Sequence, residues 1–128
     1  MKRALALSFT MVFMLASAFS VFAAEPNRDA IKKRVDEIVA EINGGKTAAD
    51  FESAAKEDPY VFVMKKDGTM VVHPTKAGKS IKEDMEPVYS AISKATAEGT
   101  WVTYEWQGKT KNSYVREAKG DLIVGSGY

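Results

Sequence analysis

The first hydrophobic positions of the chain form a run that no charged residue interrupts. Lys2 and Arg3 precede residues 4–22, which carry no charge and are rich in Ala, Leu, Phe, Val and Met. A short basic segment, an apolar run and small residues at its end, here Ala23 and Ala24, are typical of a secretory signal peptide. This pattern predicts cleavage after Ala23 or Ala24. The alternative is an uncleaved membrane anchor, because the run is close to the length that a bilayer requires.

After this segment the apolar positions take a helical spacing. Within residues 27–43 they recur every three or four residues, along one side of a helix: Ile31, Val35, Ile38, Val39 and Ile42. Asn27 is a suitable N-cap, and the Gly-Gly pair that follows the segment is a suitable end. We expect Thr47 to cap a second, shorter helix, with Asp50 as its capping-box partner.

From residue 60 the spacing becomes that of β-strands. Two short apolar runs, 60–64 and 69–73, flank an Asp-Gly turn and predict a hairpin. Pro74 ends the second strand, because proline has no N–H to donate to a sheet. A polar excursion and a helix over residues 84–98 come next, and the chain finishes with three strands, at 101–106, 111–117 and 122–124.

These elements predict an α+β fold in one domain, residues 24–128, after a signal peptide of residues 1–23. Hairpin connections imply a five-stranded antiparallel sheet, with the long N-terminal helix over one face and the other helices also packed on the sheet. The 128 residues of the chain leave no room for a second independent core.

The charge balance gives little reason to expect a polyanionic partner. The chain has 18 Lys and Arg against 17 Asp and Glu. Cleavage of the signal peptide removes two of the positive charges, so that 16 face 17 and the net charge becomes −1. Because a strongly basic field is missing, we expect no binding to nucleic acid.

The residue types that carry most catalytic and metal chemistry are scarce. The chain has no cysteine and one histidine, His73, which rules out a disulfide framework, a thiolate zinc site and a His-rich metal site. A serine nucleophile needs a neighbouring base, and no serine lies in a nucleophile elbow. Phosphate-loop and calcium-loop spacings are also missing. We therefore expect no enzyme activity, no metal and no cofactor.

The positive chemical signal is a set of amphipathic side chains on the predicted sheet. It comprises four aromatic residues with a polar tip and two further donors: Tyr60, Tyr104, Trp106, Tyr114, Lys111 and His73. Pockets for small anions combine apolar walls with a few convergent donors in this way. In the alternative interpretation the aromatic residues are plain core and Lys111 is an exposed lysine beside a turn. Strand alternation also puts Lys111 and Tyr114 on opposite faces unless a bulge intervenes.

Seven segments, taken together and in this order, resemble the single Cache domain, an extracytoplasmic sensor module. They are Gly45-Lys46-Thr47, Tyr60-Val61-Phe62-Val63, Asp67-Gly68-Thr69, His73-Pro74, Tyr104-Glu105-Trp106, Lys111-Asn112-Ser113-Tyr114-Val115 and Gly125-Ser126-Gly127-Tyr128. The resemblance runs from about Asp29 to Tyr128. It implies a PAS-like antiparallel sheet with a pocket between the sheet and the loop-and-helix excursion. Members of the family sense small molecules, often short carboxylates, in the periplasm.

By this resemblance the pocket is lined by His73, Tyr104, Trp106, Lys111 and Tyr114. Lys111 is expected to pair with a carboxylate, and His73 to add a donor whose strength depends on pH. The chain then is a free-standing periplasmic or secreted binding protein for a small organic acid. Its partner is expected to be a membrane-bound receptor or histidine kinase.

A second hypothesis makes the protein an accessory interaction subunit without a ligand of its own. In that case the N-terminal helix docks on a membrane receptor or kinase, or on a second copy in a homodimer, through its apolar stripe. The observation that separates the two hypotheses is whether the protein's own sheet already covers that stripe.

Overall fold

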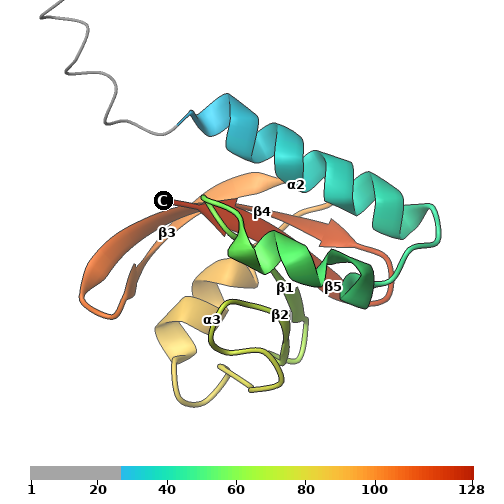
Figure 1. Cartoon of the computed structure of the whole chain (residues 1–128). Helices are drawn as coiled ribbons and strands as arrows, with labels where there is room; N and C mark the ends of the chain where they lie inside the picture. The colour runs from blue at the N-terminus through green and yellow to red at the C-terminus, as the bar shows by residue number, and fades with distance from the viewer. Residues whose placement is uncertain (1–26) are drawn as a thin grey trace, which may run out of the picture.

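The computed structural model describes residues 27–128, and the predicted signal peptide lies outside the described residues. Five strands form one sheet in the order β2-β1-β5-β4-β3, with every neighbouring pair antiparallel. The strands are β1 (Val61–Lys65), β2 (Met70–Val72), β3 (Thr100–Trp106), β4 (Lys109–Ala118) and β5 (Leu122–Gly127). Figure 1 shows helix α2 on one side of this sheet and helix α3 on the other. The α+β, PAS-like architecture predicted from the sequence is confirmed.

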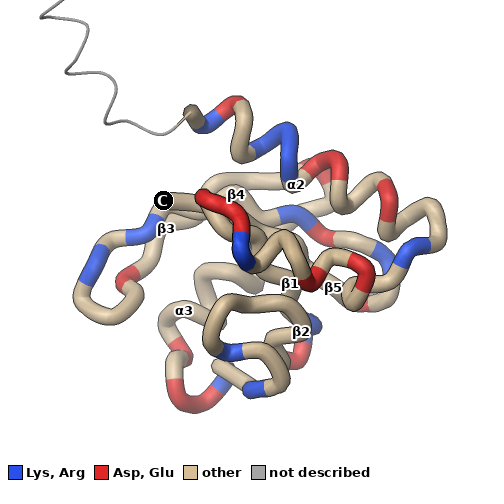
Figure 2. The backbone as a smooth tube through the Cα atoms, in the orientation of Figure 1, with Lys and Arg blue, Asp and Glu red and all other residues tan. Residues whose placement is uncertain are grey.

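Helix α2 (Arg28–Asn43) covers one face of the sheet over β4 and β5. Asn27 caps it, because the side-chain oxygen accepts a hydrogen bond from the Ala30 amide at 3.1 Å. The predicted apolar stripe faces the sheet, and its members are at most 4% exposed: Ile31, Val35, Ile38, Val39 and Ile42. The rest of the helix carries charges of both signs (Figure 2). The protein's own sheet therefore buries the apolar side of α2.

The second predicted helix is a 3-10 helix, η1 (Ala48–Lys56), which packs against β1 and β2. Its start follows the predicted capping box, since the Asp50 carboxylate accepts hydrogen bonds from the backbone amide and the hydroxyl of Thr47. A non-helical backbone conformation at Phe51 interrupts the segment, and the 3-10 form replaces the expected α-helix. Tighter 3-10 turns are common in short pieces of this length.

The other face of the sheet carries α3 (Glu86–Ile92) and the excursion, defined as residues 73–85. The excursion borders β2, where the Met70 amide donates to the Lys79 carbonyl at 2.8 Å. The prediction that α3 continues to residue 98 is wrong. The chain leaves the helix so that Thr96 can bridge to Arg116 and accept a hydrogen bond from the Glu117 amide at 2.9 Å.

Strand alternation divides the core into two layers. On β1, Val61 and Val63 point toward α2, whereas Phe62 and Met64 point toward α3 and the excursion. The sheet is therefore buried on both faces, and the second layer includes Val88 and other residues of the α3 side. Among residues 27–128, no helix combines the length and the apolar character needed to cross a membrane.

Candidate functional site

Four of the five predicted site residues converge on the α3 side of the sheet, together with Tyr60. The His73 ring lies between Tyr60 and Trp106, with ring centroids 5.4 Å and 5.3 Å away. The Lys111 ammonium lies 5.1 Å from the centroid of the Tyr60 ring, and Tyr104 faces Lys111 across the β3–β4 pair. We call these five residues the aromatic cluster. Tyr60 directly precedes β1, His73 directly follows β2, and the other three members belong to the β3–β4 hairpin.

The hairpin register explains why Tyr104, Trp106 and Lys111 share a face. Gln107 and Gly108, which both have positive φ angles (50° and 81°), form the two-residue turn between β3 and β4. Such a turn pairs its flanking residues directly, so that Trp106 lies opposite Lys109 and Tyr104 opposite Lys111. Paired residues and residues two positions apart point to the same side of a sheet.

Within residues 27–128, Lys111 combines partial burial with the lack of a carboxylate partner. The Lys32, Lys46 and Lys66 ammonium groups each lie within 3.0 Å of a carboxylate oxygen. No carboxylate of residues 27–128 forms such an ion pair with Lys111. Burial lowers the pKa of its ammonium, because the charged form loses water that no anion replaces. The site therefore contains a partly desolvated positive charge without a counter-ion from the described residues.

His73 is held by the backbone of the excursion. Its Nδ1 accepts hydrogen bonds from the amides of Thr75 at 3.1 Å and Lys76 at 3.0 Å. The residue is only 8% exposed. This burial, together with the positive charges of Lys76 and Lys111, lowers the pKa of His73 to about 4. The ring is neutral at pH 7, so the titration expected of this residue near physiological pH is displaced to acid pH.

Tyr104 is a buried member of the cluster. Its hydroxyl shares a 2.9 Å hydrogen bond with the Ser113 hydroxyl. Burial raises the pKa of Tyr104 to about 12, so this hydroxyl is neutral at physiological pH. Tyr60 was named from the sequence among the candidate amphipathic side chains, but neither it nor Ser113 was included in the predicted pocket lining. The alternation of side chains along a strand could have indicated both residues. Ser113 stands two residues from Lys111, and Tyr60 stands two residues from Phe62, which faces the α3 side of the sheet.

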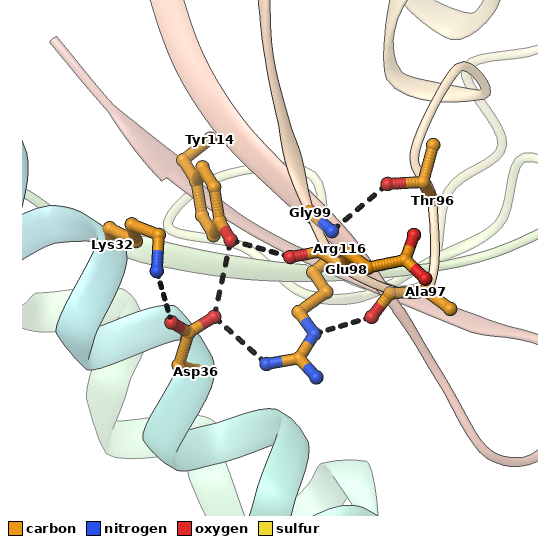
Figure 3. Close-up of polar contacts among 8 residues, drawn as sticks. All are labelled: Lys32, Asp36, Thr96, Ala97, Glu98, Gly99, Tyr114 and Arg116. Atoms are coloured by element: carbon orange, nitrogen blue, oxygen red, sulfur yellow. Dashed lines mark hydrogen bonds and ion pairs between the residues drawn. The ribbon is translucent and has the colours of Figure 1, made fainter.

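The structure places Tyr114 on the opposite face of the sheet, as strand alternation indicated. Its hydroxyl lies 2.9 Å from the Glu98 carbonyl oxygen and 3.3 Å from the Asp36 carboxylate of α2 (Figure 3). The same carboxylate accepts hydrogen bonds from Lys32 and Arg116 at 3.0 Å and 2.9 Å. Tyr114 thus belongs to the junction between α2 and β4, and it does not meet the other four predicted residues.

A cavity of about 350 Å³ lies beside η1, and His73 is the one member of the aromatic cluster that lines it. Its walls are η1, with Glu52 and Lys56, and the end of β2 with Pro74. Within residues 27–128, no group of three or more His, Cys, Asp or Glu side chains could hold a metal ion. The arrangement thus offers aromatic walls, hydroxyl groups, one neutral imidazole and one ammonium for the recognition of a small molecule.

A five-stranded antiparallel sheet with an N-terminal helix on one face and a loop-and-helix excursion on the other defines a PAS-like fold. The family model described as "Single Cache domain 2" matches residues 2–121, and the chain belongs to this family. Among solved structures, one similar chain is "The ligand binding domain of Mlp24 with asparagine". It shares 15% sequence identity at a TM-score of 0.41, and the match covers 63% of this chain and 34% of that chain. No curated protein sequence matches.

Proposed function

We propose that the protein binds a small organic anion, most simply a short carboxylate, in the aromatic cluster. The observation that carries this proposal is the Lys111 ammonium, which is partly desolvated and has no carboxylate partner among residues 27–128. A buried charge is costly unless an opposite charge accompanies it. A bound anion supplies that charge, while the rings of Tyr60 and Trp106 form walls for its apolar part.

The proposed role is that of an extracytoplasmic binding or sensing protein without enzyme activity. Export rests on the predicted signal peptide, and signalling then requires a membrane-bound receptor or histidine kinase as partner. The only histidine supports a non-catalytic role, because two backbone amides already occupy its Nδ1. A ring held in this way is poorly placed to exchange protons with a substrate at that atom.

The competing hypothesis, docking through the apolar stripe of α2, has less support. Every member of that stripe is at most 4% exposed, because it packs on β4 and β5. A partner or a second copy that uses this helix must bind its charged side instead (Figure 2). We therefore favour ligand binding over docking through α2.

The proposal can be tested with a single-tryptophan reporter. The chain has two tryptophans, and Trp101→Phe leaves Trp106, whose ring lies 5.3 Å from that of His73. We expect acetate, propionate or another short carboxylate to change the fluorescence of Trp106 at micromolar concentrations, and calorimetry to give the same affinity. Titration against short organic acids and amino acids that finds nothing tighter than millimolar would overturn the proposal.

Lys111→Met tests the charge itself. We expect at least about a thirtyfold loss of carboxylate affinity, because the anion loses its counter-charge inside a partly dry site. Lys119→Met, an exposed lysine in the turn after β4, is the matched control and should bind as the wild type does. Folding should be unharmed in both variants. Equal affinities for Lys111→Met and the wild type would exclude Lys111 from the site.

A further inference from the structure

The two nitrogens of the His73 ring have different surroundings. Both hydrogen bonds that the structure gives this side chain end at Nδ1, and both come from backbone amides, those of Thr75 and Lys76. An amide N–H can only donate, so Nδ1 must offer a lone pair. The proton of the neutral imidazole therefore lies on Nε2, and the excursion selects this tautomer.

Nε2 is free to donate outward. The nitrogens sit on different edges of the ring, so Nε2 points away from the amides that bind Nδ1. Among the described residues, every fully buried side-chain nitrogen or oxygen has a hydrogen-bond partner. Nε2 has no such partner there, and it must therefore reach accessible space. The His73 ring packs beside Tyr60 and Trp106, and the residue also lines the cavity against η1. The result is a neutral donor with a fixed direction at the edge of the aromatic cluster.

We propose that the Thr75 and Lys76 amides hold His73 as the Nε2–H tautomer, which makes it a specificity-determining donor to an oxygen of the bound anion. The second part of this inference rests on the proposed function, whereas the tautomer does not. A neutral N–H donor bonds an unprotonated carboxylate oxygen and gains nothing from a proton in solution. The site therefore distinguishes ligands by their acceptor atoms, and its affinity varies little between pH 8 and pH 6.

The charges around His73 favour the neutral ring. Lys76 of the excursion and Lys111 of β4 are both positive and oppose protonation. On the side of η1, Glu52 and Lys56 line the adjoining cavity and carry opposite charges. Tyr60, at the start of β1, contributes an uncharged ring whose hydroxyl pKa is raised by burial. No group on these elements is placed to stabilise an imidazolium as an ion pair within the described residues.

Because His73 is the only histidine of the chain, its tautomer can be read from one imidazole spin system in a 15N-correlated NMR spectrum of the whole protein. We expect the pattern of an Nε2–H ring at pH 7 and no titration between pH 8 and pH 5.5. An Nδ1–H ring, or a titration midpoint above pH 6, would overturn the proposal. This experiment needs no ligand. A failure to find a ligand would contradict the proposed function, but the NMR spectrum would still decide whether the tautomer is the one proposed.

Two substitutions separate the roles of the two nitrogens. His73→Asn keeps an acceptor near Nδ1 but removes the Nε2 donor, whereas His73→Gln keeps a donor near Nε2 but removes the acceptor. With acetate and propionate as probes, we expect His73→Asn to lose about tenfold in affinity or more, with slow hydrogen exchange retained at the Thr75 and Lys76 amides. His73→Gln should bind better than His73→Asn but exchange faster at both amides.

Other outcomes would contradict the proposal. Wild-type affinity in His73→Asn would show that Nε2 donates nothing to the anion. Unchanged exchange at Thr75 and Lys76 in His73→Gln would show that Nδ1 does not hold the excursion. In the wild type, a rise in affinity of about tenfold between pH 8 and pH 6 would show that a charged imidazole takes part in binding.

Discussion

Lys111 and Tyr114 stand three residues apart on β4, and they belong to opposite faces of the sheet. Lys111 faces Tyr104 and the aromatic cluster, whereas the Tyr114 hydroxyl contacts Asp36 of α2 and the Glu98 carbonyl oxygen. An odd separation along a strand has this consequence wherever no bulge intervenes. The β3–β4 register is continuous from Thr100 to Trp106, so no bulge restores a common face.

Tyr114→Phe should therefore lower stability and leave ligand affinity unchanged. The substitution removes the donor to two acceptors, and we expect a loss of about 1 kcal/mol in the free energy of unfolding. Lys111→Met should do the opposite, with weaker carboxylate binding and no loss of stability. Urea unfolding and calorimetric titration of both variants make the comparison. A weaker carboxylate affinity in Tyr114→Phe would contradict this prediction and show that Tyr114 contributes to the binding site.

Residue-level patterns in the sequence were informative where they depended on neighbours along the chain. Strand alternation alone separated Lys111 from Tyr114. The hydrogen bonds at His73 could not be predicted in this way, because they depend on the path of the excursion after Pro74. The low pKa of His73 likewise depends on burial and on Lys111, a residue far away in the sequence. Burial and the distances between charges far apart in the sequence are properties of the folded chain, so residue types alone do not predict the pKa of His73.

At the scale of elements, the connection between α3 and β3 depends on Gly99. This residue has a φ angle of +97°, and its amide donates to the Thr96 hydroxyl at 2.9 Å. A Cβ atom placed on it would overlap the hydroxyl and the ring of Tyr114. Glycine is therefore needed here for two separate reasons, the left-handed backbone and the close approach of a side chain.

Gly99→Ala should cost clearly more stability than Gly120→Ala. Gly120 also has a positive φ angle, +83°, but nothing lies near the position of its Cβ, so it carries the backbone cost alone. We expect about 1 kcal/mol for Gly120→Ala and about 3 kcal/mol or more for Gly99→Ala. Combining Gly99→Ala with Tyr114→Phe should relieve part of the excess, because the hydroxyl is the closest atom. Equal costs for the two glycine variants in chemical denaturation would contradict this account.

The same connection shows why element boundaries were harder to predict than elements. The apolar spacing of α2 and its caps correctly indicated a helix that ends at Asn43. For α3 the apolar spacing continues beyond Ile92, but Thr96 pairs with Arg116 of β4 and the helix stops. A local pattern does not include competition from a distant strand. Helix ends that depend on tertiary pairing therefore cannot be predicted from a local sequence pattern.

At the scale of the molecule, the five-stranded antiparallel sheet was predicted from the sequence, whereas its strand order and the assembly of the site were not. Two hairpins and a closing strand leave few antiparallel arrangements, and the observed order, β2-β1-β5-β4-β3, is one of them. Because β2 and β3 form opposite edges, His73 and Trp106 come from opposite ends of that order. Their rings meet on the α3 side, and the twist and curvature that bring them together are not encoded in a local pattern.

The only histidine also links the stability of the whole molecule to pH. The pKa of His73 is near 6.5 in an unfolded chain and about 4 in the folded protein. Between these values the unfolded state binds a proton that the folded state does not bind. The free energy of unfolding therefore rises with pH, and the contribution is complete above pH 6.5 and is lost as the pH falls toward 4.

We expect acidification from pH 7 to pH 4.5 to remove about 2 kcal/mol through this residue, with a slope no steeper than about 1.4 kcal/mol per pH unit. His73→Asn cannot titrate and should flatten the profile over this range. Asp36, whose pKa is lowered by Lys32 and Arg116, adds its own loss only below its ordinary value of 3.8. Urea unfolding at pH 7, 6, 5 and 4.5 measures both profiles. Parallel profiles for the wild type and His73→Asn would show that the folded protein protonates His73 as readily as the unfolded chain does.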